Sequence, residues 1–79
     1  MKAYEVIEKY GWVQNTYGCK SLGFCAVGAI DFCGSPDRNE AFNAVYQHLG
    51  TSFSSITDWN DKPGRTKKEV LNLLRHLNV

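Results

Sequence analysis

A chain of 79 residues has room for one small domain, placed at residues 1–79, because so short a chain buries only about 60% of the surface it exposes when unfolded. Its 43% of hydrophobic residues favour a packed domain over a disordered one. Nine Lys and Arg against eight Asp and Glu leave a net charge of +1, which excludes a general attraction to nucleic acid or to an anionic membrane.

The sequence gives no sign of export or of metal binding. Residues 1–5 contain no apolar signal-peptide core, and no run approaches the roughly 20 apolar residues of a membrane span, so we expect a cytoplasmic protein. The cysteines are odd in number and form no C-x-x-C pair, and the histidines lie on other segments. We therefore expect reduced thiols, no metal site and no cofactor from these residues: Cys19, Cys25, Cys33, His48 and His76.

Helical periodicity predicts two helices in the first half of the chain. Apolar residues recur at three- and four-residue spacing over 2–10, and Gly11 is a natural C-terminal stop. Residues 12–22 have no sustained period and predict an ordered loop. Ser21 predicts the N-cap of a second helix that runs through Cys33, in which Gly28 lets another backbone approach closely. This second helix is apolar nearly all round, which predicts a central position.

Capping residues delimit the second half of the chain. Ser35 and Pro36 predict the start of a third helix, which ends at Gly50. Residues 53–59 suggest one helical turn, and Thr66 with Glu69 forms a capping box for a last helix. The prediction is a compact all-α domain of about four helices, with no sheet of consequence and this core: Ile7, Trp12, Phe24, Ile30, Phe42, Val45, Leu49, Ile56, Trp59, Val70, Leu74 and Leu77. The apolar stripes of the third and last helices also include Tyr46 and Leu71.

Three motifs carry a resemblance to a known family. They are Gly-Trp-Val-Gln at 11–14, Cys-Ala-Val-Gly-Ala at 25–29, and Trp-Asn-Asp-Lys-Pro-Gly-Arg-Thr followed by a helix from position 59. Together they resemble a small domain-of-unknown-function family of bacteria and their phages. The resemblance implies a helical fold and a bacterial or phage origin, and it carries no activity or catalytic residue to transfer.

One hypothesis is that the protein is an enzyme. The chain order Gln14, Cys25, His48, Asn60 is that of papain-like cysteine proteases, in which a thiol at a helix N-terminus is activated by its dipole. Three expectations oppose it: Cys25 about one turn inside a helix capped at Ser21, His48 at the end of a surface helix, and no sheet to form a cleft. The favoured alternative makes Cys25 a small core residue at a close helix crossing.

A second reading makes the segment 59–68 a binding surface. Asn60 and Asp61 either contact a partner or fix the turn into the last helix, and Arg65 either contacts a partner or pairs with Asp58 or Asp61. The basic residues beside the last helix N-terminus are candidates for phosphate or nucleic-acid contact: Lys62, Arg65, Lys67 and Lys68.

The function we expect is a small non-catalytic protein-binding module. One version is a phage-encoded inhibitor or modulator of a host protein complex, acting in the host cytoplasm as a monomer or weak homodimer. Ordered loops on a rigid scaffold commonly carry binding, so the candidate partner-binding residues are Gln14, Asn15, Tyr17, Asn60, Asp61 and Arg65. Nucleic-acid binding and cysteine-dependent hydrolysis by Cys25 and His48 remain the alternatives.

Overall fold

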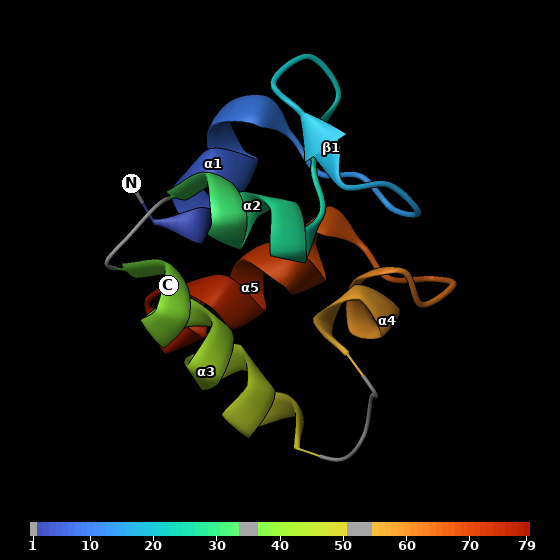
Figure 1. Cartoon of the computed structure of the whole chain (residues 1–79). Coiled ribbons are helices and arrows are strands. Elements are labelled where there is room, and N and C mark those ends of the chain that lie inside the picture. Colours follow the sequence, from blue (N-terminus) through green and yellow to red (C-terminus); the bar gives the residue numbers. More distant parts are fainter. Residues whose placement is uncertain (1, 34–36, 51–54) are drawn as a thin grey trace.

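The computed structural model describes residues 2–33, 37–50 and 55–79. Figure 1 shows the short β-hairpin at one end of the molecule, α3 at the other, and α2 and α5 between them. The elements in this part of the chain are α1 (Ala3–Tyr10), β1 (Gly18–Cys19), β2 (Gly23–Phe24), α2 (Ala26–Cys33), α3 (Asp37–Leu49), α4 (Ile56–Asn60) and α5 (Lys67–Leu77). The mainly helical fold is confirmed, whereas the hairpin was not predicted.

Most predicted helix ends agree with the structure. Gly11 follows α1 with φ +101°, a conformation that a glycine adopts without strain. The capping box of α5 is formed: the amide N–H of Glu69 donates to Oγ1 of Thr66 at 3.2 Å, and the Thr66 N–H donates to the Glu69 carboxylate at 3.1 Å. Ser55 caps α4 through its hydroxyl. The predicted cap at Ser35 and Pro36, and Phe53, lie outside the described residues.

The predicted start of the second helix at Ser21 is wrong, because residues 23 and 24 are extended. β2 pairs antiparallel with β1, and its other edge meets residues 11–13, where the Phe24 N–H donates to the Gly11 carbonyl at 3.0 Å. Gly23 makes this possible: its φ is +98°, and a Cβ there would lie 2.6 Å from the Gly11 carbonyl carbon. The hairpin therefore holds the chain extended until Cys25, and α2 begins only at Ala26.

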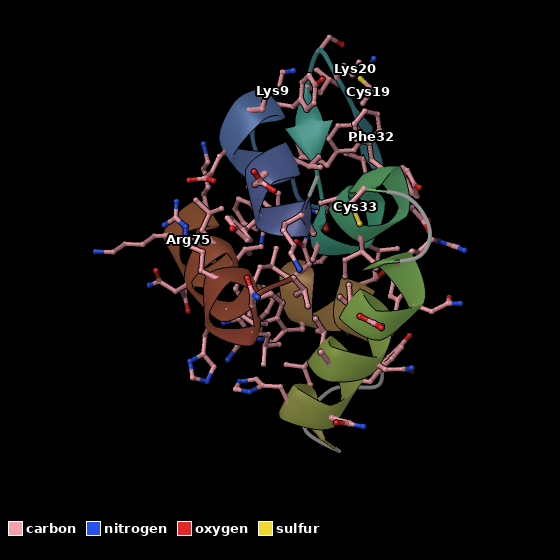
Figure 2. All side chains as sticks on the ribbon, turned by 90° about the vertical axis from the view of Figure 1, so that its left-hand side faces the viewer. Lys9, Cys19, Lys20, Phe32, Cys33 and Arg75 are labelled. Atoms are coloured by element: carbon pink, nitrogen blue, oxygen red, sulfur yellow. The ribbon has the colours of Figure 1, made fainter. Side chains whose placement is uncertain are left out.

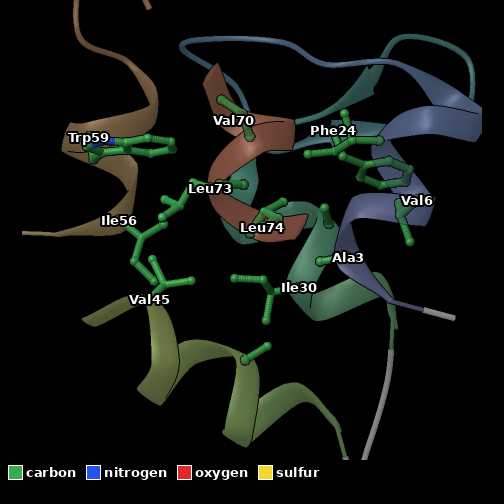
Figure 3. Close-up of a cluster of buried hydrophobic side chains, with 14 residues drawn as sticks. Ala3, Val6, Phe24, Ile30, Val45, Ile56, Trp59, Val70, Leu73 and Leu74 are labelled. Atoms are coloured by element: carbon green, nitrogen blue, oxygen red, sulfur yellow. The ribbon is translucent and has the colours of Figure 1, made fainter. Parts of the chain in front are cut away.

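The core lies where α1, α2 and α5 meet, with α3 and α4 closing one side (Figure 3). Of the twelve predicted core residues, Trp12, Phe42, Leu49 and Leu77 are only partly buried and the others are buried. Tyr46 is wrong as a buried residue, since it is 51% exposed. On α5 Leu73 is buried together with Val70 and Leu74, while Leu71 is only partly buried; the helix packs against α1 and α3.

The two ends of the described chain are tied together. The Val79 carbonyl accepts the N–H groups of Ala3 and Tyr4 at 2.7 and 3.3 Å, which satisfies two amides of the first turn of α1. Arg75 on α5 forms an ion pair with Glu8 on α1. Within the described ranges, no helix is long and apolar enough to span a membrane.

Candidate functional site

The side chain of Asn60 is fully buried, and each of its polar atoms is bonded. Its Oδ1 accepts the indole N–H of Trp12 at 2.6 Å and the backbone N–H of Ala26 at 2.9 Å. Its Nδ2 donates to the Val13 carbonyl at 3.1 Å and to the Asp61 carboxylate at 2.9 Å. One amide thus joins α4 to the first residue of α2 and to the segment after α1. We call these bonds the Asn60 network.

Gln14 and Asn15 extend the Asn60 network from the same segment. Nε2 of Gln14 donates to the backbone carbonyls of Asn60 and Lys62 at 3.1 and 3.0 Å, and the Asn15 N–H donates to the Asp61 carboxylate at 2.9 Å. These bonds hold together two segments that are 46 to 48 residues apart in the sequence. The Gly-Trp-Val-Gln and Trp-Asn-Asp motifs are therefore two halves of one contact.

The Cys-Ala-Val-Gly-Ala motif supplies the third side of this contact. Ala26 gives its N–H to Asn60, and Gly28 lies against the loop before β1, where a Cβ would come within 2.3 Å of the Tyr17 carbonyl oxygen. The expectation that Gly28 admits another backbone is confirmed. The backbone it admits belongs to a loop, and the Cys25 N–H fixes that loop by donating to the same carbonyl at 3.2 Å.

The loop between α4 and α5 is braced by Arg65. Its Nε donates to the Trp59 carbonyl at 2.9 Å, its guanidinium lies 4.2 Å from the centre of the Trp59 ring, and Nη1 pairs with Glu69 at 3.0 Å. Burial opposes a low pKa for Glu69, but hydrogen bonds from Thr66 and Arg65 hold that pKa below its usual range.

These contacts correct the predicted role of Asn60. It is completely buried, so it has no surface to offer a partner. Gln14, Asp61 and Arg65 also form bonds within the molecule. Of the predicted partner-binding residues, Asn15 and Tyr17 remain exposed.

Cys25 lies immediately before α2, which corrects the expectation that it sits a turn inside a helix. Its carbonyl accepts from the Ala29 N–H at 2.8 Å, and its sulfur accepts from the Gly28 N–H at 3.3 Å, so the thiol caps the helix. Burial and the negative charge of Asp61 raise the pKa of the Cys25 thiol, although backbone N–H groups oppose this. Cys25 as a whole is 4% exposed. It borders a pocket of about 240 Å³ lined by Asn15, Thr16, Tyr17, Cys25, Val27, Thr57 and Asp61.

The structure does not bring His48 to Cys25. His48 lies beside His76, with ring centres 6.0 Å apart, and lines a different groove with Trp59 and Arg65. The carboxamide of Asn60, which would have to orient the histidine, is bonded to Trp12 and Ala26. The papain-like order in the sequence therefore has no counterpart in the arrangement of these side chains.

The hairpin end of the molecule, where α1 and α2 meet the hairpin, has an exposed apolar surface that was not predicted from the sequence. The rings of Tyr10, Phe24 and Phe32 pack with centres 5.0 to 5.9 Å apart; Phe32 remains 40% exposed, and Leu22 at the hairpin turn is 65% exposed. Lys20 lies 5.6 Å from the centre of the Phe32 ring, and Lys9 lies 5.2 Å from that of Tyr10. Figure 2 shows both lysines and Phe32 at this end of the molecule. We call Lys9, Tyr10, Lys20, Leu22 and Phe32 the hairpin-end face.

The loop that leads into the hairpin is anchored through Tyr17. Its hydroxyl donates to Asp31 at 2.8 Å, and Asp31 also pairs with Arg38 of α3. Burial and the Asp31 carboxylate raise the pKa of Tyr17 to about 12, so the hydroxyl keeps its proton at neutral pH. Burial opposes a low pKa for Asp31, but the bonds from Tyr17 and Arg38 lower it, so this carboxylate stays charged.

The basic residues near α5 are not assembled around an anion site. Lys62, Lys67 and Lys68 are exposed, while Arg65 is engaged with Trp59 and Glu69. The carboxylate of Glu69 already occupies the N-terminus of α5 through the capping box. A negative ligand would have to compete with it there.

The fold and its interior define a class: a small helical domain with a short hairpin, held together by one buried asparagine. The chain belongs to a family of unknown function, DUF6197, which it matches over residues 1–77. No curated protein and no solved structure matches the chain. The family therefore supplies a relationship but no activity, and function must be argued from the surface.

Proposed function

We propose that this protein is a non-catalytic protein-binding module that docks on its partner through the hairpin-end face. The observation that supports the proposal is the exposure of Leu22, at the turn of a hairpin that is fixed on both sides, and of Phe32 on the neighbouring helix α2. Large apolar side chains on a rigid support bury area in a complex at little cost in conformational entropy.

The rigidity of this face comes from contacts already described. β2 is paired with β1 on one edge and with residues 11–13 on the other, and Tyr17 ties the preceding loop to Asp31. Phe32 belongs to α2, whose N-terminus is held by Asn60. The Asn60 network thus positions the proposed docking face without taking part in it.

The chemistry of this face indicates the kind of partner surface. Leu22 and Phe32 offer an apolar centre, and Lys9 and Lys20 place positive charges beside the rings. A complementary surface has an apolar pocket or ridge bordered by Asp or Glu, because carboxylates there would meet the lysines. Asn15 and Tyr17, exposed on the adjoining loop, extend the candidate contact region.

The finer form of the proposal is a phage-encoded inhibitor or modulator of a host protein complex, acting in bacterial cytoplasm as a monomer or weak homodimer. The small size of the chain supports it, because inhibition by covering a surface needs no cofactor and no cleft. Genes of family members placed among phage early genes would support this form, and a consistent place among bacterial housekeeping genes would count against it.

The test uses an aspartate scan of exposed apolar residues. The wild-type protein is immobilised, partners are captured from bacterial lysates and identified, and affinity is then measured with the purified partner. Leu22→Asp is expected to weaken binding at least about tenfold, because it puts a charge at the apolar centre. Tyr46→Asp is the matched control, since Tyr46 is 51% exposed on α3, away from the hairpin (Figure 1). Equal affinity of wild type and Leu22→Asp would contradict the proposal, as would the absence of any partner.

Nucleic-acid binding through Lys62, Arg65, Lys67 and Lys68 is the competing proposal. It predicts binding to DNA or RNA that weakens steeply with salt and is lost in the double variant Lys67→Glu, Lys68→Glu. Those two lysines are exposed and lie outside the hairpin-end face, so this variant leaves the proposed docking face intact.

A further inference from the structure

The fold brings the chain's two histidines together from different helices. His48 is in the last turn of α3 and His76 in the last turn of α5, 28 positions further along the chain, and their ring centres lie 6.0 Å apart at an interplanar angle of 63°. Both side chains are exposed and border a groove of about 290 Å³, into which Asn72 and Glu69 also face. Among the described residues, neither ring has a hydrogen bond or an ion pair, so the ring nitrogens are open to a ligand.

The spacing of the two rings suits a shared metal ion. Metal–nitrogen bonds of about 2.0 to 2.1 Å to two imidazoles on one ion place their ring centres roughly 5 to 6 Å apart. The observed 6.0 Å is at the upper end of that range. Small rotations of these two exposed side chains are enough to shorten the distance between the ring centres. The helices themselves are fixed, because Val45 of α3 and Leu73 and Leu74 of α5 are in the core.

We propose that His48 and His76 form an interhelical two-histidine site for a divalent transition-metal ion. Neutral imidazole is a preferred ligand of Cu²⁺, Ni²⁺ and Zn²⁺, whereas Mg²⁺ and Ca²⁺ prefer oxygen. Within the described ranges no group of three His, Cys, Asp or Glu side chains comes together. The site is therefore an open one, in which water fills the positions that the two imidazoles leave.

The groove determines what else can reach the ion. Asn72 lies four residues before His76, so it shares the same face of α5 and lines the same groove. A carboxylate or imidazole from outside the chain can enter by the same groove. The ion would also hold the end of α3 against α5.

The test is a metal titration of the untagged Cys19→Ser protein, in which the exposed thiol cannot compete for the ion. At about pH 7.5, calorimetry with CuCl₂, NiCl₂ and ZnCl₂ is expected to give one site per chain, with Cu²⁺ bound most tightly. A saturating ion is expected to raise the melting temperature by about 3 °C or more, because it binds the folded state preferentially.

Single variants locate the site. His48→Asn and His76→Asn are each expected to weaken binding at least about tenfold, because one histidine alone cannot chelate. Both side chains are exposed, and circular dichroism checks that each variant is folded. In a second readout, substoichiometric Cu²⁺ is expected to broaden the NMR signals of both imidazoles before any others. No binding at millimolar metal, or binding that survives either substitution, would overturn the proposal.

Discussion

The Asn60 network and the hairpin-end face use polar and aromatic residues in opposite ways. In the network, the polar groups of Asn60, Trp12 and Gln14 are turned inward and bonded to partners far away in the sequence. At the hairpin, Leu22, Phe32 and two lysines are turned outward. Residues that stand out in a sequence need not be those that meet a partner, because building a small core also requires specific polar contacts.

The length of the chain explains why the interior needs this network. A domain of this size buries too little apolar surface to be stable by a wide margin. The buried Asn60 amide adds to the stability of this small core by joining three segments through hydrogen bonds. Among the described residues, no buried side-chain polar atom is left without a hydrogen bond. Removing the Asn60 side chain should therefore destabilise the whole fold, whereas substitutions at the hairpin turn should leave the free energy of unfolding nearly unchanged.

The largest effect is expected from Asn60→Ala. The substitution leaves the Trp12 indole N–H, the Ala26 N–H and the Val13 carbonyl without their partner, at about 1 to 3 kcal/mol for each buried group. We expect a loss of at least about 3 kcal/mol in the free energy of unfolding, measured by urea denaturation. Asn72→Ala, at an exposed position of α5, is the matched control and should change stability by less than about 0.5 kcal/mol.

A smaller loss is expected from Gly28→Ala. Alanine in place of glycine normally stabilises a helix by about 1 kcal/mol, but here the new methyl group would meet the Tyr17 carbonyl oxygen. The loop or the helix must shift, and we expect a net loss of about 1 to 3 kcal/mol. A gain in melting temperature would show that the loop does not lie against α2 as described.

The cysteines of the two regions should differ in reactivity. Hydrogen bonds from Ser21 lower the pKa of the exposed Cys19 thiol, whereas burial raises that of Cys25. At neutral pH, iodoacetamide should therefore modify Cys19 at least about tenfold faster than Cys25, as followed by mass spectrometry of peptides. Faster reaction of Cys25 would restore the interpretation of this residue as an activated nucleophile.

The smallest effect on stability is expected from Leu22→Asp. The side chain is 65% exposed and contributes little buried area, so the free energy of unfolding should change by less than about 0.5 kcal/mol. If Leu22→Asp also loses partner binding, the hairpin-end face serves binding while the Asn60 network serves stability. A large loss of stability would instead assign Leu22 to the fold.

Local signals in the sequence predicted most helix ends but not the contacts between distant segments. Thr66 with Glu69 and Gly11 act on neighbouring residues, so their roles could be predicted from spacing. Ser21 resembled an N-cap because nothing local shows that Gly23 pairs with Gly11 and β1. The partners of Asn60, and the pairing of His48 with His76, arise only when segments 28 to 48 residues apart meet.

The candidate site was predicted least well for the same reason. The sequence singled out Asn60, Asp61 and Arg65 because the motif around them is distinctive, but it could not show that their side chains face inward. Leu22 and Phe32 are large apolar residues, which are more often buried, and nothing local in the sequence shows that they stay exposed. Gly18 and Gly23, which both have positive φ, are the residues in the sequence that could have indicated the hairpin.

Hydrogen exchange of the Trp12 indole N–H tests the central claim most directly, because this proton makes the shortest bond of the Asn60 network, at 2.6 Å. Measured by NMR, it should exchange only through global unfolding, with a protection free energy equal to the stability obtained by denaturation. It should lose that protection in Asn60→Ala wherever the variant remains folded. Exchange of the wild-type indole as fast as that of an exposed tryptophan would contradict the account.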